Sequence, residues 1–309
     1  MTQPAVKAPA APKMNVMSLV RRGPQKVPLR LFIHGVPKVG KSTCASGAPD
    51  PLFLPLDNGV EALDVAKLPK PKDWDNALDM VRAVADDPGE FKTLVIDPIN
   101  LLEAMCFAKV TGGSNIDKWD GGYGRGFSAA LDHWRVLLSE IERAWTKGMN
   151  IILVAHSDTK NAPNPEGADY LHFVPAMKPN AAGLFTGWVD AILFARTESG
   201  SVVDSTKKAK GVSTKTRVFH TTWAAPWEAG NRWSLPDTIP LGWVELQDAI
   251  AASERSADDL RSQITAIASQ LGPDAQAKAK SYVNSAGSRV DRLREILNAL
   301  NEKVKEVST

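Results

Sequence analysis

The segment that most constrains this chain is Leu29–Thr43, in which an apolar run, a glycine-containing turn and the start of a helical pattern follow one another. Gly35, Gly40, Lys41 and Ser42 fit the spacing G-x-x-x-x-G-K-[ST]. Glycines let a backbone curl so that successive N–H groups point inward at phosphate oxygens, and the helix that follows adds its positive dipole end. An ordinary tight strand-to-helix turn is the alternative, but the apolar run before the first glycine favours a phosphate-binding loop.

The spacing also predicts a role for each part of this loop. Lys41 is expected to reach the β- and γ-phosphates of a nucleotide, and the Ser42 hydroxyl is expected to ligate Mg²⁺. The sequence therefore predicts ATP and Mg²⁺ as cofactors. The expected nucleotide contacts are Gly35, Val36, Pro37, Lys38, Val39, Gly40, Lys41, Ser42 and Thr43.

Length and composition limit the class of protein. The chain has 309 residues, of which 43% are hydrophobic and 23% are charged, as is typical of one large α/β domain with a small appendage. A net charge of +2 does not indicate a nucleic-acid binder by itself, so any basic surface must be local. Cys44 and Cys106 form neither a disulfide framework nor a metal-binding spacing. Without a bilayer-length apolar run or a secretory signal pattern, we expect a cytoplasmic protein with no membrane partner.

Strand patterns alternate with helical patterns from residue 29 onward. This order predicts a mostly parallel sheet with helices on both faces. After residue 197, an antiparallel hairpin is expected from Val202-Val203 and Thr216–Thr222, joined by a Lys-rich turn at 207–210. The predicted strands are 29–34, 52–56, 93–97, 150–155 and 190–196, and the clearest helices are 74–85 and 128–147.

Three regions follow from these patterns. Residues 1–26, rich in Ala and Pro, are expected to form a disordered arm, whose apolar-basic patch at 17–22 docks either on the domain or on a neighbouring subunit. Residues 27–245 form the expected ATPase core. Residues 246–309 carry two apolar helical stripes interrupted at Gly272-Pro273, which predicts a small helical module.

Two acids end predicted strands where ligands of open α/β sheets gather. Asp97 is expected to hold Mg²⁺ together with Ser42, the latter directly and the former through water. Asp57 could activate the attacking water as a general base. The alternative for Asp57 is an Asx turn with Asn58 and Gly59, and Glu103 is the reserve candidate for the base.

Two further residues are expected to complete catalysis. His156 ends the strand that we expect beside the phosphate loop, where it could sense the γ-phosphate, although a lone histidine is often structural. Arg232 lies between Asn231 and Trp233 on a predicted loop and could serve a neighbouring subunit's ATP site as an arginine finger. A surface ion pair is the other interpretation of Arg232.

Two long loops could contact nucleic acid. The first, 111–127, carries Tyr123, Arg125 and Phe127, which could stack on bases or bind phosphates. The second, 157–180, carries Lys160 and Lys178. The alternative for both loops is a flexible lid over the nucleotide.

Taken together, several segments resemble the phage RecA-like P-loop ATPases of the Sak group, single-strand annealing proteins usually described as AAA-family ATP-binding proteins. The resemblance covers about residues 27–245. It implies a RecA-like core, ATP-linked binding of single-stranded DNA, assembly of identical subunits into a ring or filament, and a working link to single-strand-binding protein. The matching segments are Gly35–Thr43, Leu56–Gly59, Thr93–Asp97, Gly122–Gly126, the strand ending in His156, and Ala229–Pro236.

The chain departs from this group at two positions. Relatives usually carry Glu where Asp57 falls, so hydrolysis could be slow or the base could lie elsewhere. Relatives often carry Lys where Gly230 falls, which leaves Arg232 as the remaining charge of that segment.

Two functions are compatible with these patterns. The first is a DNA-stimulated ATPase that binds single-stranded DNA and promotes strand annealing or recombination in a phage or prophage. The second is an assembly or loader protein for replication or recombination that uses ATP as a switch with little turnover. A small-molecule kinase is disfavoured, because no arginine-rich substrate lid is evident.

Overall fold

A computed structural model describes residues 16–20, 25–164, 167–203 and 209–308. The strands are β1 (Arg30–Gly35), β2 (Pro51–Pro55), β3 (Ala66–Lys67), β4 (Thr93–Asp97), β5 (Asn150–Ala162), β6 (Tyr170–Pro175), β7 (Ala191–Val203), β8 (Ala209–His220), β9 (Gly230–Asn231) and β10 (Thr238–Pro240). The α-helices are α1 (Lys41–Ser46), α2 (Trp74–Asp86), α3 (Leu102–Thr111), α4 (Arg125–Thr146), α5 (Pro179–Trp188), α6 (Trp243–Gln270), α7 (Pro273–Ala286) and α8 (Val290–Ser308). Short 3₁₀ turns occupy Val16–Leu19, Ile99–Leu101 and Trp119–Gly121.

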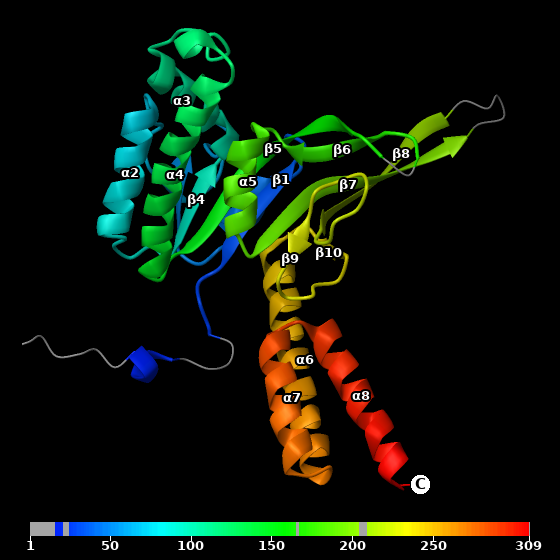
Figure 1. Cartoon of the computed structure of the whole chain (residues 1–309). Helices are drawn as coiled ribbons and strands as arrows, with labels where there is room; N and C mark the ends of the chain where they lie inside the picture. Colours follow the sequence, from blue (N-terminus) through cyan, green and yellow to red (C-terminus); the bar gives the residue numbers. More distant parts are fainter. Residues whose placement is uncertain (1–15, 21–24, 165–166, 204–208, 309) are drawn as a thin grey trace, which may run out of the picture.

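The centre of the molecule is a sheet with the strand order β10-β8-β7-β1-β5-β4-β2-β3 (Figure 1). All pairs from β7 to β3 are parallel, as the alternation of strand and helix patterns predicts. β5 pairs directly with β1, which confirms the position expected for the strand that carries His156. The fold is therefore mixed α/β with a mostly parallel sheet.

Both faces of the sheet are buried, because residues alternate between two apolar clusters. Phe32 belongs to the cluster beneath α2, α3, α4 and α5, whereas its neighbours Leu31 and Ile33 belong to the cluster on the opposite face. That second cluster is closed by α1 and by Trp243 and Leu246 at the start of α6. This two-sided burial explains why the central strands read as nearly continuous apolar runs.

Two hairpins extend from the sheet. The predicted hairpin after residue 197 is confirmed as β7 and β8, which pair antiparallel. Lys207 and Lys208 of its expected turn lie outside the described residues. The prediction of a long loop over 157–180 is wrong: β5 continues to Ala162 and pairs antiparallel with β6, from Ser157 opposite Pro175 to Ala162 opposite Tyr170. Residues 157–162 of β5 are almost all polar, so the sequence did not show that this strand continues beyond the core and pairs with β6.

The C-terminal helices pack around a separate apolar cluster that includes Leu260, Ile264 and Leu293. The boundary expected at 245/246 lies inside one continuous helix, α6, which begins in the sheet's cluster and ends in this one. The expected break at Gly272-Pro273 separates α6 from α7. Of the expected N-terminal arm, residues 1–15 and 21–24 lie outside the described residues.

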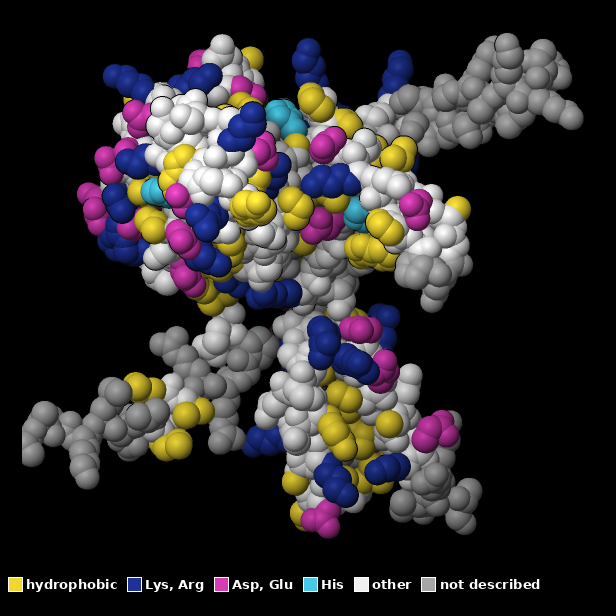
Figure 2. Space-filling model, turned by 45° about the horizontal axis from the view of Figure 1, so that its top comes forward, with side chains coloured by type: hydrophobic (Ala, Val, Ile, Leu, Met, Phe, Trp, Pro, Cys, Tyr) yellow, Lys and Arg dark blue, Asp and Glu magenta, His cyan; other side chains and the backbone are white. Residues whose placement is uncertain are grey.

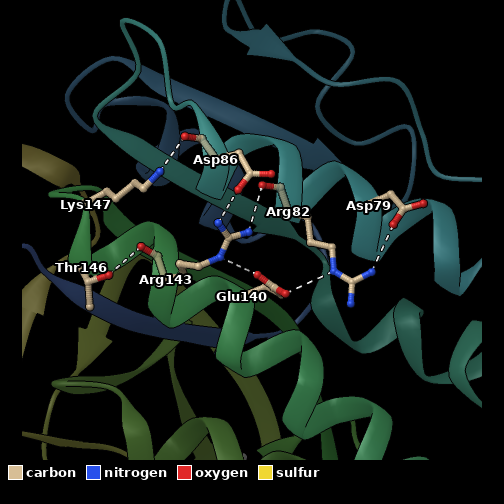
Figure 3. A network of polar contacts seen from close by, with 7 residues as sticks. All are labelled: Asp79, Arg82, Asp86, Glu140, Arg143, Thr146 and Lys147. Carbon is tan, nitrogen blue, oxygen red and sulfur yellow. Dashed lines mark hydrogen bonds and ion pairs between the residues drawn. The ribbon is translucent and has the colours of Figure 1, made fainter. Parts of the chain in front are cut away.

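A polar network on the outer surface fixes α4 against α2 (Figure 3). Glu140 accepts hydrogen bonds from Arg82 at 3.2 Å and from Arg143 at 2.8 Å, and Arg143 also pairs with Asp86. Lys147 donates to the Asp86 carbonyl oxygen at 2.6 Å. Isolated surface ion pairs add little stability, but several charges joined in a network can hold two helices together. Here they hold the C-terminal half of the helix whose first turn carries Arg125 and Phe127.

Candidate nucleotide site

The predicted phosphate loop connects β1 to α1 at the carboxyl edge of the sheet. Gly40 has a φ of 111° at the residue before α1, a conformation that L side chains rarely adopt. Gly35 is required for a different reason: a β-carbon there would lie 2.2 Å from the Ala195 carbonyl oxygen of β7. Val39 is buried, whereas Val36, Pro37 and Lys38 are exposed. The loop therefore has the backbone geometry that its two glycines predict.

Lys41 is buried inside this loop. Its ammonium group donates hydrogen bonds of 2.9 Å to the Gly35 and Val36 carbonyl oxygens. Burial lowers the pKa of Lys41 to about 8, against the opposing charges of Asp97 and Asp57. A cation held this close to the loop backbone lies where the terminal phosphates of a nucleotide are expected.

Asp97 and Ser42 meet beside the loop. Burial raises the pKa of the Asp97 carboxyl to about 6, whereas a hydrogen bond with the Ser42 side chain lowers it. Within the described part of the chain, the buried Asp97 Oδ2 has no hydrogen-bond partner. An unsatisfied carboxylate oxygen next to a hydroxyl fits a hard divalent cation, since Mg²⁺ prefers such oxygen ligands. Asp97 and Ser42 are therefore the residues that would hold Mg²⁺.

Asp57 follows β2 on the same edge of the sheet. Its Oδ1 accepts a 2.7 Å hydrogen bond from the Gly59 backbone N–H, so the Asx turn that Asp-Asn-Gly predicts is present. The Asp57 charge also raises the pKa of Asp97 and of Lys41, which places this carboxylate within electrostatic reach of both. The turn and the catalytic role are thus compatible, and the role of base stays a prediction.

His156 lies opposite Gly35 in the β1–β5 register. Its Nδ1 is buried and lacks a partner among the residues that the structure describes. Burial and the Lys41 charge both lower the pKa of His156, so the ring is neutral at physiological pH. The backbone N–H of His156 donates to the Asn100 Oδ1 at 2.9 Å. A neutral imidazole with an unpaired nitrogen beside the loop suits a sensor of bound phosphate.

Two residues near the site were not predicted from the sequence. Asn100, three residues after Asp97, links the end of β4 to His156 in β5. The side chain of Arg217, in β8, donates to the Val39 carbonyl oxygen at 3.4 Å. The proximity of Asn100 to Asp97 in the sequence was a usable signal, but Arg217 lies 178 residues from Val39 and had none.

Arg232 lies at the other edge of the sheet. Its Nη1 is 3.1 Å from the Asp190 Oδ1, and its backbone N–H donates to the Asp190 carbonyl oxygen. Asp190 precedes β7, and it also accepts from Arg30 at the start of β1. The surface ion pair is therefore present, and this chain's own phosphate loop is at the opposite end of β1. Because 58% of the Arg232 side chain is exposed, a role at a neighbouring subunit's site stays a prediction.

The structure brings three of the predicted DNA contacts to one pocket of about 450 Å³, formed between α3, α4 and α5. Tyr123 is fully exposed at its rim, Phe127 lines it, and the Lys178 ammonium lies 4.4 Å from the centre of the Phe127 ring. The Lys178 backbone N–H donates to the Glu103 Oε1 at 2.8 Å. Burial raises the pKa of Glu103, and the charges of Lys178 and Lys160 lower it. The reserve candidate for the base therefore belongs to this pocket.

The other two predicted DNA contacts lie nearby. Arg125, the first residue of α4, pairs with Asp120 at 3.5 Å and remains largely exposed. Lys160 lies on β5 opposite His172 of β6.

Lysines and arginines on the visible face of the core are mixed with acidic side chains (Figure 2), in keeping with the low net charge. Within the described helices, none is long and apolar enough to cross a bilayer.

The comparisons with known proteins agree with this geometry. A family model described as an AAA domain matches residues 27–233, which include the phosphate loop, Asp97 and His156. No curated protein matches the chain. AAA domains are nucleotide-binding P-loop ATPases, and the match spans well over half of the sequence. The chain therefore belongs to the AAA-domain family of P-loop ATPases.

Proposed function

We propose that this protein is an ATP-dependent single-stranded-DNA-binding protein with a RecA-like core, which promotes strand annealing or recombination in a phage or prophage. The proposal depends on one observation: the candidate nucleotide site and the pocket lined by Phe127 and Lys178 lie at the same edge of the sheet. Asp97 ends β4, and Glu103 of the pocket follows six residues later. The Ala176 N–H donates to the His156 carbonyl oxygen, and Lys178 of the pocket follows Ala176 by two residues.

In this proposal, the loop backbone and Lys41 bind the phosphates, Asp57 activates water, and His156 senses the terminal phosphate. Asp97 and Ser42 hold Mg²⁺, which when bound neutralises charge on the β- and γ-phosphates. A shift of His156 is transmitted through β5, which continues without a break into the hairpin that carries Lys160. Lys178 and Phe127 then change their hold on the DNA strand, the base stacking on the aromatic side chain.

The proposal includes self-assembly around or along the DNA. Arg232 keeps an exposed guanidinium at the amino edge of the sheet, from which it would reach the ATP of an adjacent copy. Single-strand-binding protein is the partner that the resemblance suggests, and the host cytoplasm is the expected compartment.

ATP hydrolysis measured with and without single-stranded DNA tests the proposal. We expect an oligonucleotide to stimulate the wild-type protein severalfold, and Lys41→Ala to abolish hydrolysis in both conditions. Lys178→Ala should weaken DNA binding by about tenfold while leaving DNA-free hydrolysis intact, because a lost stacking or phosphate contact costs roughly 1–3 kcal/mol. The matched control is Lys92→Ala, which removes the same charge from an exposed side chain at the opposite edge of the sheet.

Salt supplies a second readout, since contacts with DNA phosphates weaken as counterions compete. Binding should fall steeply with salt for the wild type and less steeply for Lys178→Ala. A polynucleotide that changes neither hydrolysis nor nucleotide affinity would contradict the DNA-binding function and leave an ATPase of another kind.

The second candidate function is a nucleotide-switched assembly or loader protein with little turnover. The Asx turn at Asp57 favours it, because the Oδ1 that accepts from Gly59 is less available as a base. Asp57→Ala separates the two functions. An annealing ATPase would lose turnover and activity, whereas a switch would keep nucleotide-dependent assembly and its function.

A further inference from the structure

Arg217 brings a positive charge to the phosphate loop from a distant strand. Its Nη1 donates to the Val39 carbonyl oxygen at 3.4 Å. The same atom would lie 2.8 Å from a β-carbon placed on Gly40. Arg217 therefore contacts the loop at Val39 and Gly40, immediately before α1.

The sheet order shows which end of a nucleotide would meet this side chain. Asp57 follows β2, Asp97 ends β4 and His156 lies within β5, and these three strands are all on one side of β1. Arg217 lies on β8, two strands away on the other side of β1. The γ-phosphate must face the metal-holding acid and the water-activating base. The sugar and base then extend toward β7 and β8.

The backbone around Arg217 is firmly placed, although its side chain is exposed. Arg217 pairs with Thr197 of β7, and its carbonyl oxygen accepts a 2.9 Å hydrogen bond from the Leu241 N–H. The next residue, Val218, is buried and pairs with both Arg196 and Pro240. The guanidinium thus projects from a fixed strand while one of its nitrogens holds the loop.

From these observations we infer that Arg217 binds the nucleoside end of the nucleotide, with its planar guanidinium against the purine ring. The inference rests on nucleotide binding at the phosphate loop and adds a residue that the motif does not contain. A guanidinium suits this role because it is planar, always charged and able to stack on a ring while it donates hydrogen bonds.

The test measures how tightly the full-length protein binds ATP, ADP and inorganic tripolyphosphate in the presence of Mg²⁺. Arg217→Ala should raise the Kd for ATP and for ADP by the same factor, about fivefold to tenfold. It should leave the Kd for tripolyphosphate unchanged, because tripolyphosphate has no ring for the guanidinium to contact. Arg217→Lys should resemble Arg217→Ala, since an ammonium group lacks the planar surface.

The controls separate misfolding and failure of the parent proposal from failure of this inference. Lys215→Ala removes the same charge from the same strand and should bind ATP like the wild type, while thermal unfolding reports whether each variant folds. An unchanged Kd for ATP in Arg217→Ala, or an equal loss for tripolyphosphate, would overturn the inference. If the wild-type protein did not bind ATP, the assignment of the whole nucleotide site would be refuted instead.

Discussion

The two edges of the central sheet differ in whether their buried charged and polar groups have hydrogen-bond partners. At the amino edge, Asp190 accepts hydrogen bonds from Arg30 at 2.6 and 3.1 Å and pairs with Arg232. The Arg30 guanidinium lies 4.6 Å from the ring centre of Trp145 and 5.1 Å from that of Trp188. At the carboxyl edge, the buried Asp97 Oδ2 and His156 Nδ1 are without a partner in the described residues.

This difference separates structural charges from functional ones. A buried polar atom without a partner costs stability, so native proteins satisfy nearly all of them. The charged groups of the amino edge follow that rule, although the ring nitrogen of Trp188 beside Arg30 has no partner in the described residues. The carboxyl edge departs from it at the strand tips that surround the phosphate loop, where a nucleotide and its metal ion would satisfy the unpaired atoms. Unsatisfied groups in a cleft are therefore a guide to a ligand site.

The largest effect, on ATP hydrolysis, is expected from Lys41→Ala at the carboxyl edge. The substitution removes the cation that would face the terminal phosphates, so ATP hydrolysis should fall by at least about 100-fold. Thermal stability should not fall correspondingly, because burial lowers the pKa of Lys41 and its charge is held at a cost. Hydrolysis assays with thermal unfolding measure both quantities, with Lys72→Ala as a surface control. Hydrolysis within tenfold of the wild type would refute the assignment of this site.

The largest effect on stability is expected at the amino edge. Asp190→Ala leaves the largely buried guanidinium of Arg30 without its carboxylate, which should cost roughly 3–5 kcal/mol of unfolding free energy. Asp190→Asn keeps one oxygen acceptor and should cost less. Chemical denaturation without nucleotide measures the difference. A loss below about 1 kcal/mol would show that the two edges do not differ in the way described.

Asp97→Asn should raise the free energy of unfolding of the nucleotide-free protein, whereas Asp190→Ala lowers it. The pKa of Asp97 is raised from 3.8 to about 6, so its ionised form destabilises the fold above that range. At pH 7.5 the free energy of unfolding of the variant should exceed that of the wild type by about 1–3 kcal/mol. This difference should shrink as the pH falls from 6 toward 3.8. Denaturation at several pH values tests this, together with loss of Mg²⁺-dependent hydrolysis. A destabilised variant at pH 7.5 would contradict the prediction.

The smallest effect is expected on the pH dependence of stability and involves His34. This buried residue lies at the carboxyl edge, and both of its ring nitrogens have hydrogen-bond partners. Its ring nitrogens lie 2.8 Å from the Ser157 Oγ and 2.7 Å from the Glu228 carbonyl oxygen. Burial lowers the pKa of His34 from 6.5 to about 4. The unfolded chain therefore binds a proton that the folded chain refuses, and stability present above pH 6.5 is lost as the pH falls toward 4.

His34→Gln should remove this acid sensitivity. The difference in unfolding free energy between wild type and variant should change by about 1 kcal/mol between pH 7 and pH 5.5. Comparing the two proteins across that range cancels the contribution of Asp97, which both retain. A difference that stays constant with pH would show that His34 is accessible to protons in the folded state.

The amino-acid sequence was sufficient for the features that local pattern controls. The apolar strands, the phosphate loop and the acid at the tip of β4 all follow from spacing, because each depends on residues adjacent in the chain. The strand that carries His156 was also expected beside the phosphate loop, and β5 does pair with β1. The β5–β6 hairpin was missed, because β5 continues through the polar residues 157–162, where no apolar pattern indicates a strand.

What the tertiary structure decided was which distant residues share a site. It placed Arg217 against Val39, brought Phe127 and Lys178 to one pocket, and put Arg232 at the edge away from its own loop. Sequence spacing reports the direction of a side chain only within one helix or strand. The order of strands in the sheet determines which of those elements meet, and that order arises from packing contacts across the whole chain.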